Sequence, residues 1–315
     1  METLERGIQH PTCAPVLLRA TELAALAATR GAGRAEAEEL RQRAVRAIGH
    51  AFDLAGFQVE PDLGVRHGTA GWTEVLTEES EVPAWYLVAY PAEGASLAAS
   101  GRGGAISVLY AAAPGAVPDL PPLRYMLKVV AGAAGRDALD LDDDLGDNLR
   151  RLAFARDVKV GDLLVAVLER PRHQDLINEI KSAGARLVLL EEGELAGALL
   201  AASGTGGVDA MVGIGGLQET VVEAGLARCL GGEITAKLWP RNDEERDLAG
   251  PEGLGRTYGI GDLAPGPVEA AITGISDGLL LRGPRLGRPW DETESIVLST
   301  VTGTARRLTT RHHRG

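Results

Sequence analysis

The chain has 315 residues, of which 45% are hydrophobic and 24% charged, with a formal net charge of −12. These values are ordinary for a soluble globular protein with room for two domains. The acidic excess argues against a general nucleic-acid or anionic-membrane surface. No secretory signal and no bilayer-spanning stretch is evident, and Cys13 and Cys229 lie far apart in the sequence. These features predict a cytoplasmic protein that binds neither nucleic acid nor membrane.

The first half of the chain predicts an α+β arrangement. Residues 17–28 are rich in Ala and Leu and predict a helix, and residues 34–52 predict a second helix with alternating charges. Apolar runs at residues 85–90 and 105–110 predict strands, and Pro91 is expected to end the first.

The second half predicts alternating strands and helices. An acidic run at residues 137–147 predicts a solvated boundary between an α+β domain, residues 1–155, and an α/β domain, residues 156–315. Short apolar runs separated by helix-length stretches are typical of buried parallel strands in βαβ units, and they span residues 163–168, 185–190 and 208–212. Residues 239–267 predict a loop-rich region, and residues 270–274 and 295–306 predict strands. His312 and His313 are expected to belong to a frayed tail.

A polar or glycine-rich segment follows each of the three parallel strands. These segments read ERPRH at residues 169–173, EEGE at 191–194 and GIGG at 213–216. Right-handed crossovers bring the carboxyl ends of parallel strands to one edge of the sheet, and ligands bind at that edge in open α/β folds. We therefore expect the three segments to line one cleft.

The chemistry of the first and third segments suits an anion. Arg170 and Arg172 could hold phosphate oxygens bidentately, with Pro171 stiffening the turn and His173 beside them, whereas the alternative is an ordinary capping loop. Glycine permits close approach and positive φ, so the run at residues 213–216 could bring backbone N–H groups close to an anion, or it could be a tight strand-to-helix turn.

Carboxylates add a second kind of candidate. Glu192, Glu194 and Glu219 could accept sugar hydroxyls or bind a hard cation, or they could simply complement helix dipoles. Glu93 follows a strand in the first half and by itself would be an exposed turn carboxylate.

Several short sequence motifs occur in the same order as in a known protein family. The chain resembles class II fructose-1,6-bisphosphatase, a bacterial sugar phosphatase, over about residues 17 to 311. The matching strings are TELAA at 21–25, PAEG at 91–94, YMLK at 125–128, ERPRH at 169–173, EGE at 192–194, GIGGLQE at 213–219, CLGGE at 229–233 and TGISDG at 273–278.

This resemblance implies a fold, a ligand and a set of site residues. It implies an α/β protein with the layered αβαβα sugar-phosphatase fold, a homo-oligomeric state, a small-molecule sugar phosphate as ligand and Mg²⁺ or Mn²⁺ as cofactor. The residues that match the family's substrate site are Tyr125, Arg170, Pro171, Arg172, Glu192, Gly193, Glu194 and Gly216. Those that match its metal ligands are Glu93 and Glu219.

The metal side departs from the family pattern. Arg41 and Tyr90 stand where the family has aspartate ligands, and Ala95 stands where it has a threonine. The family's glycine-glutamate motif is also missing near residues 58–66, although Glu60 or Asp62 could rebuild part of the site. A fixed positive charge at Arg41 would repel a divalent ion but could contact phosphate.

Two functions therefore remain open. The first is metal-dependent hydrolysis of fructose 1,6-bisphosphate to fructose 6-phosphate and phosphate. The reaction would need a metal, because hydrolysis of phosphate esters is extremely slow unless a metal ion activates water. The second is a catalytically degenerate protein that binds a sugar phosphate in a regulatory or partner role.

Overall fold

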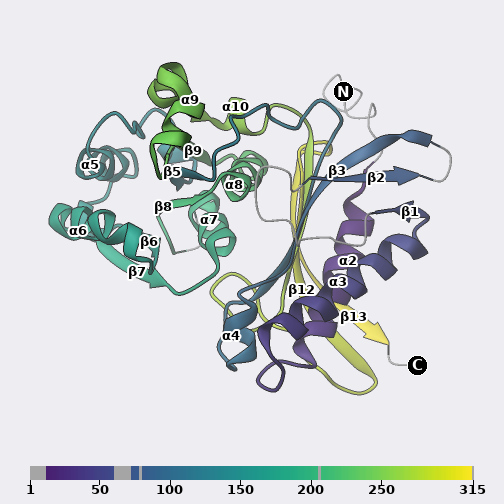
Figure 1. Cartoon of the computed structure of the whole chain (residues 1–315). Coiled ribbons are helices and arrows are strands. Elements are labelled where there is room, and N and C mark those ends of the chain that lie inside the picture. The colour runs from purple at the N-terminus through teal and green to yellow at the C-terminus, as the bar shows by residue number, and fades with distance from the viewer. Residues whose placement is uncertain (1–11, 60–71, 78–79, 205–206, 314–315) are drawn as a thin grey trace, which may run out of the picture. The chain divides into compact units, whose positions relative to one another are not determined.

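The computed structural model describes residues 12–59, 72–77, 80–204 and 207–313 (Figure 1). The chain forms two compact units: Met1–Val117 together with Gly266–Gly315 make unit 1, and Pro118–Pro265 makes unit 2. This division differs from the expected boundary near residue 155, because the chain leaves unit 1 earlier and returns to it at the end.

Unit 1 is built on a seven-stranded sheet with helices packed against it. The strand order is β1-β2-β3-β4-β11-β12-β13, and neighbouring strands are antiparallel. Helices α2 and α3 pack against each other and against this sheet. The strands are β1 (Phe57–Gln58), β2 (Thr73–Thr77), β3 (Ser80–Glu93), β4 (Ile106–Ala112), β11 (Val268–Gly274), β12 (Trp290–Ser299) and β13 (Thr304–His313), and the helices are α2 (Ala14–Thr29), α3 (Ala37–Leu54) and α4 (Ala95–Ala99).

The structure confirms the two N-terminal helices and corrects two strand predictions. Pro91 does not end β3, which continues to Glu93 with an irregular register between Tyr90 and Glu93. The strand predicted at residues 295–306 is not continuous, since that range covers the end of β12, a turn and the start of β13. The C-terminal histidines are not frayed, because His312 belongs to β13 and its Nε2 lies 2.8 Å from Thr293 Oγ1.

Unit 2 contains a six-stranded mixed sheet in the order β10-β9-β5-β8-β6-β7. Strands β6, β7 and β8 are parallel, as the sequence predicts, whereas β5 runs antiparallel to both β8 and β9. The strands are β5 (Tyr125–Ala131), β6 (Leu164–Leu168), β7 (Arg186–Leu190), β8 (Ala210–Gly216), β9 (Glu233–Leu238) and β10 (Thr257–Gly259). The supposed loop at residues 239–267 instead contains α9 (Asp243–Gly255), β10 and α10 (Ile260–Leu263).

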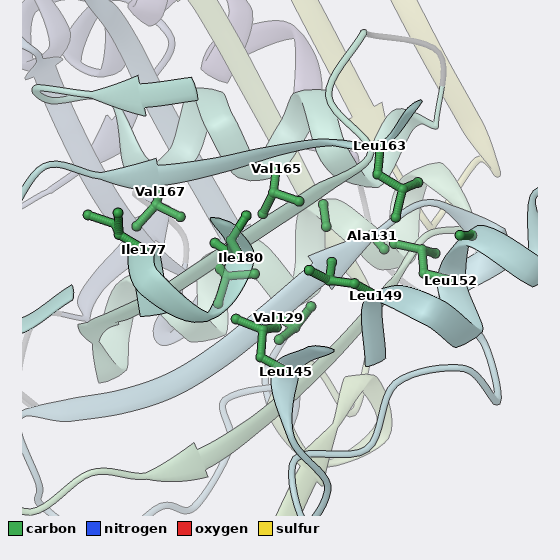
Figure 2. Close-up of a cluster of buried hydrophobic side chains, with 13 residues drawn as sticks. Val129, Ala131, Leu145, Leu149, Leu152, Leu163, Val165, Val167, Ile177 and Ile180 are labelled. Atoms are coloured by element: carbon green, nitrogen blue, oxygen red, sulfur yellow. The ribbon is translucent and has the colours of Figure 1, made fainter. Parts of the chain in front are cut away.

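Helices cover both faces of the unit 2 sheet. On one face, α5 (Leu145–Ala155) and α6 (Gln174–Ala183) bury apolar side chains against β5 and β6 (Figure 2). On β5, Val129 belongs to this core, and its neighbour Lys128 points to the opposite face because side chains alternate along a strand. That face carries α7 (Glu194–Ser203) and α8 (Leu217–Leu230), which pack against each other and against β5.

The helix and sheet layers confirm an α/β sugar-phosphatase fold. Within the described ranges, none of the helices is both long enough and apolar enough to cross a membrane.

Candidate functional site

One edge of the unit 2 sheet gathers most of the residues that the sequence singles out. The parallel strands β6, β7 and β8 all end there, and the antiparallel strand β5 begins there, with Tyr125 opposite Gly216. The start of β5 is held on both sides, since Leu217 N donates to Arg124 O and Trp239 N donates to Tyr125 O, each at 3.0 Å. The predicted convergence of strand ends therefore holds, and β5 adds Tyr125 to it.

Three guanidinium groups surround the ring of Tyr125. The Cζ atoms of Arg172, Arg124 and Arg241 lie 5.1, 5.5 and 5.9 Å from the ring centroid. Trp239 meets the same ring edge-on, with 6.3 Å between centroids. The negative face of an aromatic ring attracts each cation, but the three cations repel one another. A bound anion would relieve this repulsion.

One carboxylate offsets part of this positive charge. Glu245 accepts hydrogen bonds from Arg241, with 2.7 Å between Arg241 Nε and Glu245 Oε1 and 2.9 Å between the Arg241 backbone N and Glu245 Oε2. These bonds lower the pKa of Glu245, which keeps it ionised at neutral pH. Taken together, the three arginines and Glu245 carry net positive charge.

The two predicted phosphate-binding arginines differ in their surroundings. Arg172 is half-buried and its Nε donates to Ile214 O at 2.7 Å, which holds its guanidinium beside Tyr125. Arg170 instead donates from Nη1 to Glu169 O, at 2.9 Å. Between them, Pro171 begins the 3₁₀ turn η4 (Pro171–His173), where its fixed φ suits a first helical position.

His173 is a structural residue and not a ligand group, which corrects its place among the ligand candidates. Its side chain is fully buried, and its Nδ1 lies 2.7 Å from Leu168 O. Its Nε2 lies 2.9 Å from Ile214 N and accepts from it. The imidazole therefore joins the ends of β6 and β8.

The segment after β7 places two carboxylates on either side of Gly193. Glu192 is half-buried before the turn, and Glu194 is the buried first residue of α7. Gly193 caps that helix with φ 92° and ψ 46°, a left-handed conformation that costs glycine little and other residues more.

Glu194 belongs to a buried charge cluster. The Nζ atom of Lys128 lies 2.7 Å from Glu194 Oε1 and 2.7 Å from Glu223 Oε2. Burial raises the pKa of Glu223 to about 8, although Lys128 opposes this rise. Burial alone would lower the pKa of Lys128, but Glu194 and Glu223 outweigh it and raise that pKa above its ordinary value.

The glycine run at residues 213–216 is the carboxyl end of β8, and neither the expected positive φ angles nor a loop is found there. Its glycines do allow close approach, in this structure by side-chain groups. A Cβ at Gly215 would overlap the Glu194 carboxylate and lie 2.5 Å from Lys128 Nζ, and a Cβ at Gly216 would overlap the Glu219 carboxylate.

The residues expected to hold a metal are divided between the two units. Glu93 ends β3 in unit 1, and Glu219 lies in the first turn of α8 in unit 2. Arg41 is exposed on α3, with its Nη1 3.2 Å from Glu38 Oε2. Tyr90 lies on β3, and Ala95 is the buried first residue of α4.

Over the described ranges, no group of three or more His, Cys, Asp or Glu side chains gathers in a form that could hold a metal ion. Glu60 and Asp62, which could rebuild the site, lie outside the described residues. The residues described do not form a ready-made metal array.

Sequence reasoning missed four residues of this edge. Arg124 and Arg241 carry no motif, and only contact with Tyr125 marks them. Lys128 and Glu223 did leave a signal, because a charge inside an otherwise apolar strand or helix must be paired when it is buried.

Comparisons with known proteins agree with this fold. A family model described as bacterial fructose-1,6-bisphosphatase, glpX-encoded, matches residues 12–312. A Microcystis aeruginosa protein named D-fructose 1,6-bisphosphatase class 2/sedoheptulose 1,7-bisphosphatase is 34% identical over 238 residues, covering 70% of this chain and 69% of that protein. A protein of the same name from Synechococcus elongatus is 30% identical over 327 aligned positions, covering 94% of each chain.

Proposed function

This chain belongs to the bacterial fructose-1,6-bisphosphatase family, and from that premise we propose that it binds a phosphorylated sugar at the Tyr125 edge of unit 2. The arginine cluster on Tyr125 carries the proposal. Three guanidinium groups around one ring, of which Arg241 pairs with Glu245, suit a phosphate group with two negative charges.

The other site residues fit the sugar. In this proposal Arg172 holds phosphate oxygens, with Arg170 and the turn at Pro171 beside it. Glu192 and Glu194, on either side of Gly193, accept hydrogen bonds from sugar hydroxyls, since ionised carboxylates only accept. Gly216, opposite Tyr125, lets the Glu219 carboxylate lie close to the backbone there.

A direct test compares ligand-induced stabilisation in matched variants. Fructose 6-phosphate and fructose 1,6-bisphosphate should raise the melting temperature without added metal. Arg172→Ala should remove most of that shift, because losing a charge-assisted hydrogen bond costs roughly 1.5–3 kcal/mol, or about 10- to 100-fold in affinity. Arg246→Ala is the matched control, as Arg246 is an exposed arginine on α9. An undiminished shift in Arg172→Ala would place the phosphate elsewhere.

For the reaction, we propose that hydrolysis is weak or lost and that binding is the retained property. Arg41 and Tyr90 in place of two carboxylates support this proposal. The competing candidate is a working phosphatase that holds Mg²⁺ or Mn²⁺ with Glu93, Glu219 and further groups. Phosphate release from fructose 1,6-bisphosphate and sedoheptulose 1,7-bisphosphate, with and without Mn²⁺, separates the two. Robust turnover abolished by Glu219→Gln would establish the phosphatase.

We also propose a homo-oligomeric assembly, for which family membership is the support. Light scattering on the purified chain tests it, and a monomer across the working concentration range would contradict it.

A further inference from the structure

A fully buried lysine in unit 2, Lys128, forms an ion pair with Glu194, a proposed sugar-binding carboxylate. Lys128 is completely buried, and its ammonium lies 2.7 Å from one oxygen of Glu194 and 2.7 Å from one oxygen of Glu223. The three groups come from three elements, β5, α7 and α8. The cluster therefore fixes the first turn of α7 against the sheet and the neighbouring helix.

The space around Glu194 is shaped for this contact. A Cβ at Gly215 would overlap the Glu194 carboxylate and press on the Lys128 ammonium. The carboxylate therefore lies directly against the backbone at the end of β8, beside Gly216. Because one of its oxygens pairs with Lys128, the orientation of its second oxygen is restricted.

The cluster holds more carboxylates than its one ammonium can neutralise. Glu223 is buried, and the charged groups acting on it are Lys128 from β5, Glu194 from α7 and Glu219 one turn earlier on α8. Burial and the repulsion between two carboxylates around a single ammonium favour the protonated form of one of them. Glu223 is that group at neutral pH, since burial raises its pKa to about 8.

We propose that Lys128 and Glu223 are positioning residues that orient the Glu194 carboxylate toward the hydroxyls of a bound sugar phosphate. The proposal rests on the proposed function, because it takes Glu194 as a sugar contact. With Glu223 protonated, Lys128 is available to Glu194. Ionised Glu223 competes for the ammonium and adds negative charge beside an anionic ligand.

This role predicts a difference between two probes. Fructose 6-phosphate should use both Glu194 and the arginine cluster, whereas inorganic phosphate should use only the arginines. If Glu194 loses its orientation, the affinity for fructose 6-phosphate therefore falls and the affinity for inorganic phosphate does not. A general loss of folding would lower the affinity for both probes.

The test is calorimetric titration of the full chain with each probe at pH 7 and pH 9. For the wild type, the Kd of fructose 6-phosphate should rise by up to about tenfold between these values, as expected when a ligand shifts the pKa of a linked group by about one unit. The Kd of inorganic phosphate should change less. Glu223→Gln keeps a neutral partner for Lys128 and should abolish the rise, and Glu179→Gln, an exposed glutamate on α6, should retain it.

A second variant tests the lysine. Lys128→Met with Glu223→Leu replaces the ammonium and its second partner by apolar groups. This double variant should lower the affinity for fructose 6-phosphate at least about tenfold more than the affinity for inorganic phosphate. A Glu223→Gln variant that keeps the wild-type pH profile would overturn the positioning role alone. Wild-type protein that binds neither probe would overturn the proposed function, and the inference with it.

Discussion

Buried charge at individual residues ties stability to pH in this protein. Glu223 has a pKa raised by burial to about 8, against an ordinary value of 4.5. Between these two values folding takes up a proton at Glu223, so its contribution to stability is complete below the lower value and is lost as pH rises through the upper one. The Lys128 ammonium limits that loss but does not remove it.

Glu223→Gln should therefore gain stability relative to the wild type as pH rises from about 5 to about 8. The difference in free energy of unfolding should grow by an amount on the order of a few kcal/mol and then level off. Urea unfolding at pH 5, 7 and 9 measures it. Parallel pH dependence in the two proteins would mean that Glu223 is already ionised in the folded state.

The N-terminus of α7 is the element on which the carboxylate pair depends. Gly193 adopts φ 92° there, and Glu194 follows as the first helical residue. A side chain at Gly193 would be strained by about 1–2 kcal/mol, because Cβ meets the following carbonyl in a left-handed conformation. Relief of that strain requires the turn to rotate, which would move Glu192 and Glu194.

Gly193→Ala should lower both stability and fructose 6-phosphate affinity. Gly184→Ala is a matched control, since Gly184 ends α6 with φ 85° and has open space around it. Both variants should lose similar stability in urea unfolding, and only Gly193→Ala should lose several-fold affinity in calorimetry. Equal affinity in the two variants would show that the α7 turn does not contact the ligand.

At the scale of the whole molecule, the candidate phosphate-binding residues lie in one unit, and most positions aligned with the family's metal site lie in the other. Arg41, Tyr90, Glu93 and Ala95 belong to unit 1, and Tyr125, Arg172 and Glu194 belong to unit 2. Under the proposed function, a substitution at Arg41 or Tyr90 therefore changes no residue of the arginine cluster.

We expect Arg41→Asp with Tyr90→Asp to strengthen Mn²⁺ binding before it restores turnover. Removing one fixed positive charge and adding two carboxylates favours a divalent cation, whereas Ala95 and the missing glycine-glutamate motif still limit catalysis. Calorimetric titration with Mn²⁺ and phosphate release from fructose 1,6-bisphosphate give the two readouts. Tight stoichiometric Mn²⁺ binding by the unmodified chain would show that other groups have rebuilt the site.

The amino-acid sequence by itself determined the features that depend on residues close together along the chain. Apolar runs of strand length identified β6, β7 and β8, and chain connectivity placed their ends at one edge with Arg172 and Glu194. The collinear motifs identified the family. These features follow from periodicity and from the handedness of crossovers, which act over short stretches of chain.

Tertiary structure decided which distant residues meet. Arg124, Arg172 and Arg241 come from three separate segments and share one ring only because β5 runs antiparallel between β8 and β9. His173 carries the same side chain whether it binds a ligand or joins two strands, and only its burial against Ile214 settles that question. Lys128 and Glu223 are 95 positions apart, so their pairing, and the pKa that burial gives Glu223, arise from packing that no local pattern encodes.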